Sequence, residues 1–182
     1  ILVEAALEAV KKYKGPVRVL DIGTGSGAIA VSIAYYAENT VVDAIDISEN
    51  ALTVAVKNAE KYSTAERINF INADINRFTP EKPYSVVVSN PPYIPRGEIE
   101  KLMPEVACYE PVIALDGGED GLDFYRIIAS KLENLLYPDG TVLVEVGIGQ
   151  YAYVRELFEK KGMRVSVLKD LAGTDRVVLG SF

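Results

Sequence analysis

The sequence predicts an α/β fold built on a doubly wound, mostly parallel seven-stranded sheet whose last strand is antiparallel. Three observations indicate this fold. Short apolar runs rich in β-branched residues alternate with segments whose apolar residues recur at helical spacing. A glycine-rich turn, residues 23–27, joins the first run to a helix. The two final runs are separated by a connection too short for a crossover helix, so the last strand must reverse direction.

The first half of the chain is expected to contain four strands, at 17–21, 41–46, 68–71 and 84–88. Helical spacing follows the glycine turn and recurs at 52–59, where Ser48 is the expected N-cap. The chain opens inside an amphipathic helix with no capping residue. From this abrupt start we expect that an upstream part is missing; the alternative is a natural start that frays.

The second half begins with residues 94–121, which show no clean periodicity and are broken by prolines and a glycine pair. Stretches of this length are usually functional loops or linkers. A helix is expected at 122–136, stopped by Pro138-Asp139-Gly140, and a strand at 141–146. A helix around 154–158, with Gly162 as its C-cap, and strands at 164–168 and 176–179 complete the prediction.

Composition excludes several classes of function. The 182 residues fit one domain, residues 1–182, and contain no histidine, which removes Ser-His-Asp triads, Cys-His dyads and nearly every zinc site. We therefore expect no metal. The single cysteine, Cys108, cannot form an internal disulfide, and neither a membrane span nor a secretory signal is visible, so a cytoplasmic monomer is expected. A net charge of −7 argues against broad nucleic-acid binding.

The most informative stretch is Ser89-Asn90-Pro91-Pro92-Tyr93, directly after the fourth strand. Two prolines force the chain to leave the sheet in a rigid, extended form. This presents the Asn90 carboxamide, the Pro91 carbonyl and the Tyr93 ring at a strand's carboxyl end, where open α/β sheets bind ligands. Two acceptors beside an aromatic face suit a planar NH₂ group, either a side-chain amide or the amine of a base.

The glycine turn, Gly23-x-Gly25-x-Gly27, predicts close approach of the backbone to a cofactor. The pattern also satisfies the dinucleotide fingerprint, which leaves NAD as an alternative. However, Asp21 places a negative charge where a pyrophosphate would sit, whereas an ammonium and a sulfonium would be attracted to it. S-adenosylmethionine therefore fits the turn better.

Three further residues are expected to contact this cofactor. Asp46, at the end of the second strand, can accept hydrogen bonds from both ribose hydroxyls; its alternative role is as a favourable charge at a helix N-terminus. Asp74 and Ile75 are placed to bond the adenine amine and pack its face, and the alternative for Asp74 is a strand-end turn. Asp43 is interpreted as an isolated polar residue on a strand without an identifiable partner.

The residues Asp21 to Gly27, Asp46 and Asn90 to Tyr93 resemble Rossmann-like class I S-adenosylmethionine-dependent methyltransferases that act on planar nitrogen. The runs Tyr109-Glu110-Pro111, Ala114-Leu115 and Asp120 to Tyr125 are similar to the HemK (PrmC) family, the bacterial glutamine methyltransferases of peptide chain release factors. The resemblance implies one catalytic domain, preceded in the family by a small helical domain that we expect to be missing from this sequence. It implies release factors as the protein substrate, with no direct nucleic-acid or membrane partner.

The resemblance also assigns residues. Cofactor contacts carry over to Gly23, Thr24, Gly25, Ser26, Gly27, Asp46, Ile75 and Asn90. We add Asp21, Ile47 and Asp74 to the expected cofactor site from their positions in the sequence. Substrate contacts carry over to Asn90, Pro91, Pro92 and Tyr93, and Glu110 is added as a loop residue expected near the substrate. We expect the catalytic roles on Asn90, Pro91 and Tyr93. Several alternatives stay open: a ribosomal-protein glutamine, the adenine amine of DNA or RNA, a nicotinamide-dependent reaction, and cofactor binding without catalysis.

Overall fold

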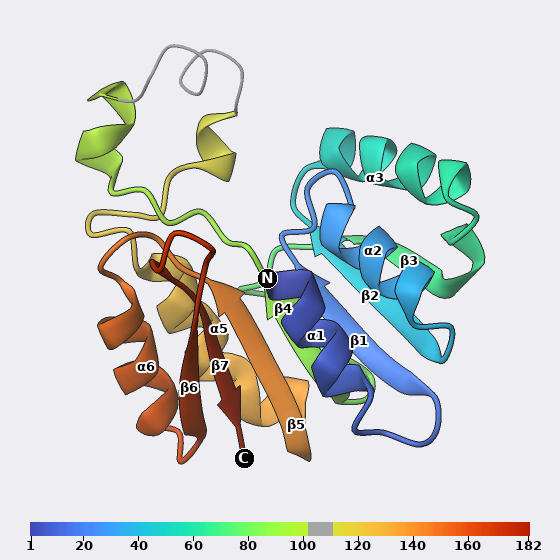
Figure 1. The fold of residues 1–182 in the computed structure, drawn as a ribbon. Helices are drawn as coiled ribbons and strands as arrows, with labels where there is room; N and C mark the ends of the chain where they lie inside the picture. Colours follow the sequence, from blue (N-terminus) through green and yellow to red (C-terminus); the bar gives the residue numbers. More distant parts are fainter. Residues whose placement is uncertain (102–110) are drawn as a thin grey trace.

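The computed structural model describes residues 1–101 and 111–182, and the expected features at Cys108 and Glu110 lie outside these ranges. Its core is a seven-stranded sheet with helices on both faces (Figure 1). The strands are β1 (Val17–Ile22), β2 (Thr40–Asp46), β3 (Ile68–Asn72), β4 (Tyr84–Ser89), β5 (Leu136–Glu145), β6 (Arg164–Lys169) and β7 (Asp175–Ser181). The helices are α1 (Leu2–Val10), α2 (Ala28–Tyr36), α3 (Glu49–Lys61), α5 (Asp123–Leu135) and α6 (Tyr151–Glu159).

The strand order is β3-β2-β1-β4-β5-β7-β6. Neighbouring strands are parallel except for β7, which is antiparallel to both β5 and β6. The predicted doubly wound sheet and its reversed last strand are therefore confirmed. Because β1 and β4 are adjacent and the chain winds away from them on both sides, their carboxyl ends form the topological switch point of the sheet.

Two hydrophobic clusters lie on opposite faces of the sheet. One packs α5 and α6 against it through buried residues such as Tyr125, Leu132 and Phe158. The other packs α1 and α2 through residues such as Ala6 and Ile33. Strand β4 is buried along its whole length, which explains its continuous apolar run.

The third helix confirms its predicted start. The Ser48 side chain caps α3 by accepting a hydrogen bond from the Ala51 N–H at 3.3 Å. Two residues after the helix, Ser63 adopts a left-handed conformation with φ 56°, which is unusual for a residue other than glycine. The Ser63 N–H donates to the Glu60 carbonyl, and the Thr64 N–H donates to the Ala59 carbonyl, as in a Schellman motif.

Two interpretations drawn from the sequence need correction. Asp43 is not isolated, because its carboxylate accepts hydrogen bonds from Arg18, Asn69 and Tyr84 at 2.9, 2.8 and 2.8 Å. The fifth strand begins at Leu136, directly after α5, and not at residue 141. Its pairing with β4 shifts register between Tyr84 and Val86, so the Pro-Asp-Gly run lies in an irregular part of the strand.

The segment that follows β4 rises above the carboxyl ends of the strands (Figure 1). It carries two short 3₁₀ helices, η2 (Arg96–Lys101) and η3 (Val112–Ala114). The base of this segment is closed by backbone pairing: Ile94 exchanges hydrogen bonds with Leu115 and Gly117, and the Arg96 N–H donates to the Gly118 carbonyl. An exposed ion pair between Arg96 and Asp116, at 2.9 Å, lies beside this pairing. Both arms of the segment thus start from a fixed point next to β4.

Candidate active site

The glycine turn connects β1 to α2 as the sequence predicts. Gly23, Gly25 and Gly27 have φ values of 69°, 56° and 79°, a backbone conformation that other residues rarely adopt. The N–H groups of Gly23 and Thr24 donate to the carbonyl of Ile45 on β2. A Cβ on Gly27 would lie 2.9 Å from that of Ala55, so glycine is also required for α3 to pack here. The turn is therefore fixed by its own backbone.

Asp21 lies beneath this turn and is completely buried. Its Oδ2 accepts hydrogen bonds from the Thr24 hydroxyl at 2.6 Å and the Ala30 N–H at 3.2 Å. Among the described residues its Oδ1 has no partner. Burial raises the pKa of Asp21 to about 6, against the opposing effect of the two hydrogen bonds. Asp21 thus supports the turn from inside the fold, and any action on a cofactor would be through its charge.

Asp46 fastens the turn to the end of β2. Its Oδ2 accepts the Gly25 N–H at 2.8 Å, and its Oδ1 accepts the Ser48 N–H at 2.9 Å. A carboxylate has about four acceptor positions, so roughly two remain. The half-buried side chain faces the cavity, next to the exposed Ile47. This leaves the acceptor capacity that two ribose hydroxyls would need.

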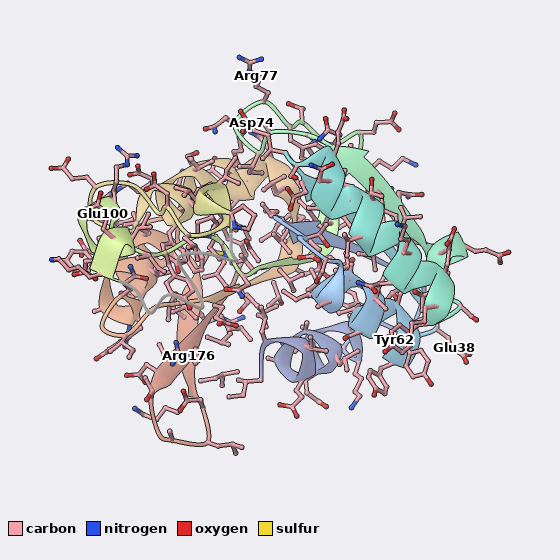
Figure 2. All side chains as sticks on the ribbon, turned by 90° about the horizontal axis from the view of Figure 1, so that it is seen from above. Glu38, Tyr62, Asp74, Arg77, Glu100 and Arg176 are labelled. Carbon is pink, nitrogen blue, oxygen red and sulfur yellow. The ribbon has the colours of Figure 1, made fainter. Side chains whose placement is uncertain are left out.

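The loop after β3 forms the next part of the wall. Asp74 Oδ1 accepts from the backbone N–H and the side-chain amide of Asn76, at 2.8 and 2.9 Å, and these bonds hold the pKa of Asp74 below its usual value. The turn role considered for this residue is therefore observed, and Asp74 lines the cavity as well. Ile75 is buried beside it. Figure 2 shows Asp74 from above, with Arg77 projecting outward from the same loop.

The exit from β4 forms the opposite wall. The Ser89 hydroxyl donates to the Ile22 carbonyl at 2.8 Å, which ties the end of β4 to the end of β1. Asn90, Pro91 and Pro92 follow and line the cavity. The Asn90 side chain is exposed, and no hydrogen bond to the described residues occupies its carboxamide. The Tyr93 ring packs against the core and not along the cavity wall.

These walls enclose one cavity of about 300 Å³ at the carboxyl ends of the strands, close to the lower end of the range for small-ligand pockets. It brings together most of the predicted cofactor residues and Asn90 to Pro92. Asp21, Thr24, Ser26, Gly27 and Tyr93 do not line it. Sequence reasoning missed several of its residues, among them Ile22, Ile45, Ser48, Ala51, Ala73, Asn76, Ser89, Pro111, Ile113, Ala114 and Phe124.

Some of the missed residues had a usable pattern. Pro111, Ala114 and Phe124 belong to the runs that carry the family resemblance, but were not assigned to a site. Together with Ile113 they bring the segment above the sheet into contact with the cavity. Within the described ranges, no helix is long and apolar enough to cross a membrane, and no three His, Cys, Asp or Glu side chains form a group that could hold a metal.

The chain is similar to known methyltransferases. The family model described as the methyltransferase small domain matches residues 4–106. A release factor glutamine methyltransferase of Clostridium acetobutylicum is 44% identical over 188 residues, covering 98% of this chain and 64% of that protein. The enzyme of the same name from Gloeobacter violaceus is 41% identical, covering 98% and 63%. The chain thus spans somewhat less than two thirds of the length of these curated relatives.

Solved structures agree on the fold. TrmN from Thermus thermophilus superposes with a TM-score of 0.69 at 24% identity, covering 99% of this chain and 48% of that protein. A methyltransferase from Pyrococcus furiosus gives 0.70 at 20% identity, covering 98% and 82%. The predicted class I methyltransferase fold and the resemblance to release factor glutamine methyltransferases are both confirmed. The chain belongs to the methyltransferase small domain family.

Proposed function

We propose that this chain transfers a methyl group from S-adenosylmethionine to the side-chain amide nitrogen of a glutamine in peptide chain release factors, within a Gly-Gly-Gln sequence. One observation carries the proposal: the turn with Asp46 and the exit with Asn90 line the same cavity. A cofactor held by the first would therefore lie next to an acceptor held by the second. The names of the relatives supply the substrate class.

The cavity offers hydrogen-bond acceptors and apolar surface that suit this cofactor. Asp46 retains acceptor positions for the ribose hydroxyls after bonding Gly25 and Ser48. Ile45 and Ile75 offer apolar surface for an adenine ring. The unbalanced negative charge of Asp21 beneath the turn favours a cationic ligand over a pyrophosphate. The ribose and adenine contacts would suit either cofactor, so it is the charge of Asp21 that argues against the nicotinamide alternative.

When bound, S-adenosylmethionine supplies a methyl group activated by its sulfonium. The work left to the chain is to orient a poor nucleophile, because the lone pair of an amide nitrogen is delocalised. In our proposal Asn90 Oδ1 and the Pro91 carbonyl accept the two N–H bonds of the glutamine amide. They aim its lone pair along the line of transfer and stabilise the positive charge as it develops. As the new N–C bond forms, the bond from the methyl to sulfur breaks and leaves a neutral thioether, and the methylated amide then releases one N–H proton to water.

Tyr93 has a different role from the stacking surface expected from the sequence. Its ring is packed behind the cavity, next to Gly147, where an added Cβ would lie 2.9 Å from Cδ2. We therefore assign it to anchoring the tetrapeptide from behind. Glu110 lies outside the residues that the structure describes, and its role as a substrate contact stays a prediction.

The test is single-turnover incubation of the chain, in excess, with S-adenosylmethionine and a bacterial release factor. Excess enzyme prevents weak substrate affinity from hiding the chemistry. Mass spectrometry should find one added methyl on the glutamine of the Gly-Gly-Gln tip, and none on a release factor whose tip glutamine is replaced by glutamate. Parallel reactions with ribosomal proteins and with adenine-containing DNA and RNA test the alternatives. An added methyl group on any of these alternative substrates, with none on the release factor, would refute the proposal.

A further inference from the structure

Gln150 lies where three backbone segments meet behind the candidate acceptor site. It is the residue before α6, in the loop that follows β5, and its side chain is half-buried. Its Nε2 donates to the Tyr93 carbonyl at 2.8 Å and to the Gly121 carbonyl at 3.3 Å. Its Oε1 accepts the Gly147 N–H at 3.0 Å. One amide therefore joins the exit from β4, the entry to α5 and the end of β5.

The arrangement uses both halves of the amide. Two carbonyls require two N–H donors, and the Gly147 N–H requires an acceptor at the other end of the same side chain. The Tyr125 hydroxyl, which donates to the Glu145 carbonyl at 2.9 Å, lies 3.5 Å from the same Oε1. Glutamate would lack the donors, and asparagine would be one methylene too short. Glutamine therefore satisfies the hydrogen bonds at this position, whereas glutamate and asparagine do not.

The backbone around this amide is packed too closely to shift. A Cβ on Gly121 would lie 2.4 Å from the Tyr93 carbonyl oxygen and 2.6 Å from Gln150 Nε2. One on Gly147 would lie 2.8 Å from Gln150 Oε1, and one on Gly117 would lie 2.8 Å from Tyr93 Cα. Two glycines of the connection between η3 and α5 and one that follows β5 thus enclose the Tyr93–Gln150 contact. Such contact is tighter than side chains tolerate, so the position of Tyr93 is defined from several sides.

We propose that Gln150 is a positioning residue that sets the orientation of the Asn90 and Pro91 acceptors by fixing the Tyr93 carbonyl. Gln150 does not line the cavity, so it touches neither cofactor nor substrate. Pro91 and Pro92 link Tyr93 to Asn90, and their φ angles are fixed. A displacement of Tyr93 is therefore transmitted to Asn90 with little loss. This inference rests on the proposed function, because it assigns the residue to that reaction.

The decisive variant is Gln150→Glu, which keeps the size and the acceptor of the side chain but replaces both donors by oxygens that face carbonyls. The matched control is Asn39→Ala. Asn39 also joins two loops through an amide-to-carbonyl bond, to Gly15 at 3.0 Å, but at the amino-terminal end of the sheet. Gln150→Glu should lower kcat for methylation of the release factor about 10- to 100-fold, since misplacement by about 1 Å can cost that much. The Kd for S-adenosylmethionine should stay within about twofold, and Asn39→Ala should keep wild-type kcat.

A second readout separates this inference from the proposed function. The chain is labelled with 3-fluorotyrosine, and the Tyr93 signal is assigned by its loss in Tyr93→Phe. Gln150→Glu should shift or broaden the ¹⁹F resonance of Tyr93, while Asn39→Ala leaves it in place. If both kcat and the resonance match wild type, Gln150 does not position the exit, whether or not a release factor is the substrate. If wild type methylates nothing while the resonance still moves, the function fails and the positioning role stands without its catalytic consequence.

A change in melting temperature alone would not support the role. If Gln150→Glu lowers kcat only in proportion to a loss of folded protein, and the Tyr93 resonance of the folded fraction is unchanged, the inference is wrong. The variant Gln150→Asn provides a last check. Asparagine is neutral and has the N–H donors of glutamine, but its side chain is one methylene shorter. This variant should therefore remain closer to Gln150→Glu than to wild type in both measurements.

Discussion

Replacing Asp21 by asparagine should remove a pH dependence from the stability of the fold. Asparagine has the same shape and can still accept from Thr24 and Ala30. Burial raises the folded-state pKa of Asp21 to about 6 from its ordinary 3.8, so between these values the folded chain keeps a proton that the unfolded chain has released. The stability that this proton contributes is complete below about pH 4 and is lost as the pH rises through about 6. A shift of about two units corresponds to about 3 kcal/mol in total.

The measurement is urea unfolding of both proteins, followed by circular dichroism at several pH values. Between about pH 4.5 and pH 8 the difference in unfolding free energy should move by about 2 kcal/mol in favour of Asp21→Asn, because part of the effect is already present at the lower pH. Glu38→Gln, at an exposed position after α2 (Figure 2), is the matched carboxyl-to-amide control. A difference that is constant across this range, or that moves in favour of wild type, would show that burial does not disfavour the charged form of Asp21.

Three further predictions concern single side chains. Asn90→Ala should reduce methylation of the release factor about 100-fold or more in single-turnover assays, since it removes an acceptor needed in the transition state; a rate within a few-fold of wild type would contradict the mechanism. Ser63→Gly should raise the free energy of unfolding by about 0.5–1 kcal/mol, because glycine adopts the left-handed conformation without strain; lower stability in urea unfolding would count against this. Asp43→Ala should cost about 2–3 kcal/mol, because it leaves the Tyr84 hydroxyl and the partly exposed Arg18 without their shared acceptor; a change below about 0.5 kcal/mol would mean that the network adds nothing.

Local patterns were sufficient for much of the fold. The apolar runs predict β1 to β4 within a residue or two of their observed bounds. This works because the apolar residues that favour each strand are consecutive in the sequence. The start of α3 follows from the hydroxyl of Ser48, a cap that acts within four residues. The reversal of β7 follows from loop length alone. In each case the deciding interaction lies close by in the sequence.

What the sequence could not reveal depends on partners far along the chain. The three residues that bond Asp43 are 25 to 41 positions away from it. The hydrogen bond from the Gln150 side chain to the Tyr93 carbonyl joins residues 57 positions apart. The early start of β5 depends on a shift in its register with β4, which no local pattern encodes. The cofactor residues were largely predictable because a turn and two strand ends converge by topology, whereas the contribution of Ile113 depends on how a non-periodic segment folds over them.

The crowding at Gly117, Gly121 and Gly147 has a practical consequence for anyone redesigning the acceptor preference of this scaffold. None of these three positions has room for a side chain, so libraries that randomise them would yield mostly inactive clones. Unlike these glycines, Ile113 and Ala114 line the cavity. Both are exposed, on η3, and can vary without disturbing the interior. A library designed to accept a different amide or amine should therefore vary Ile113 and Ala114 and leave the three glycines unchanged.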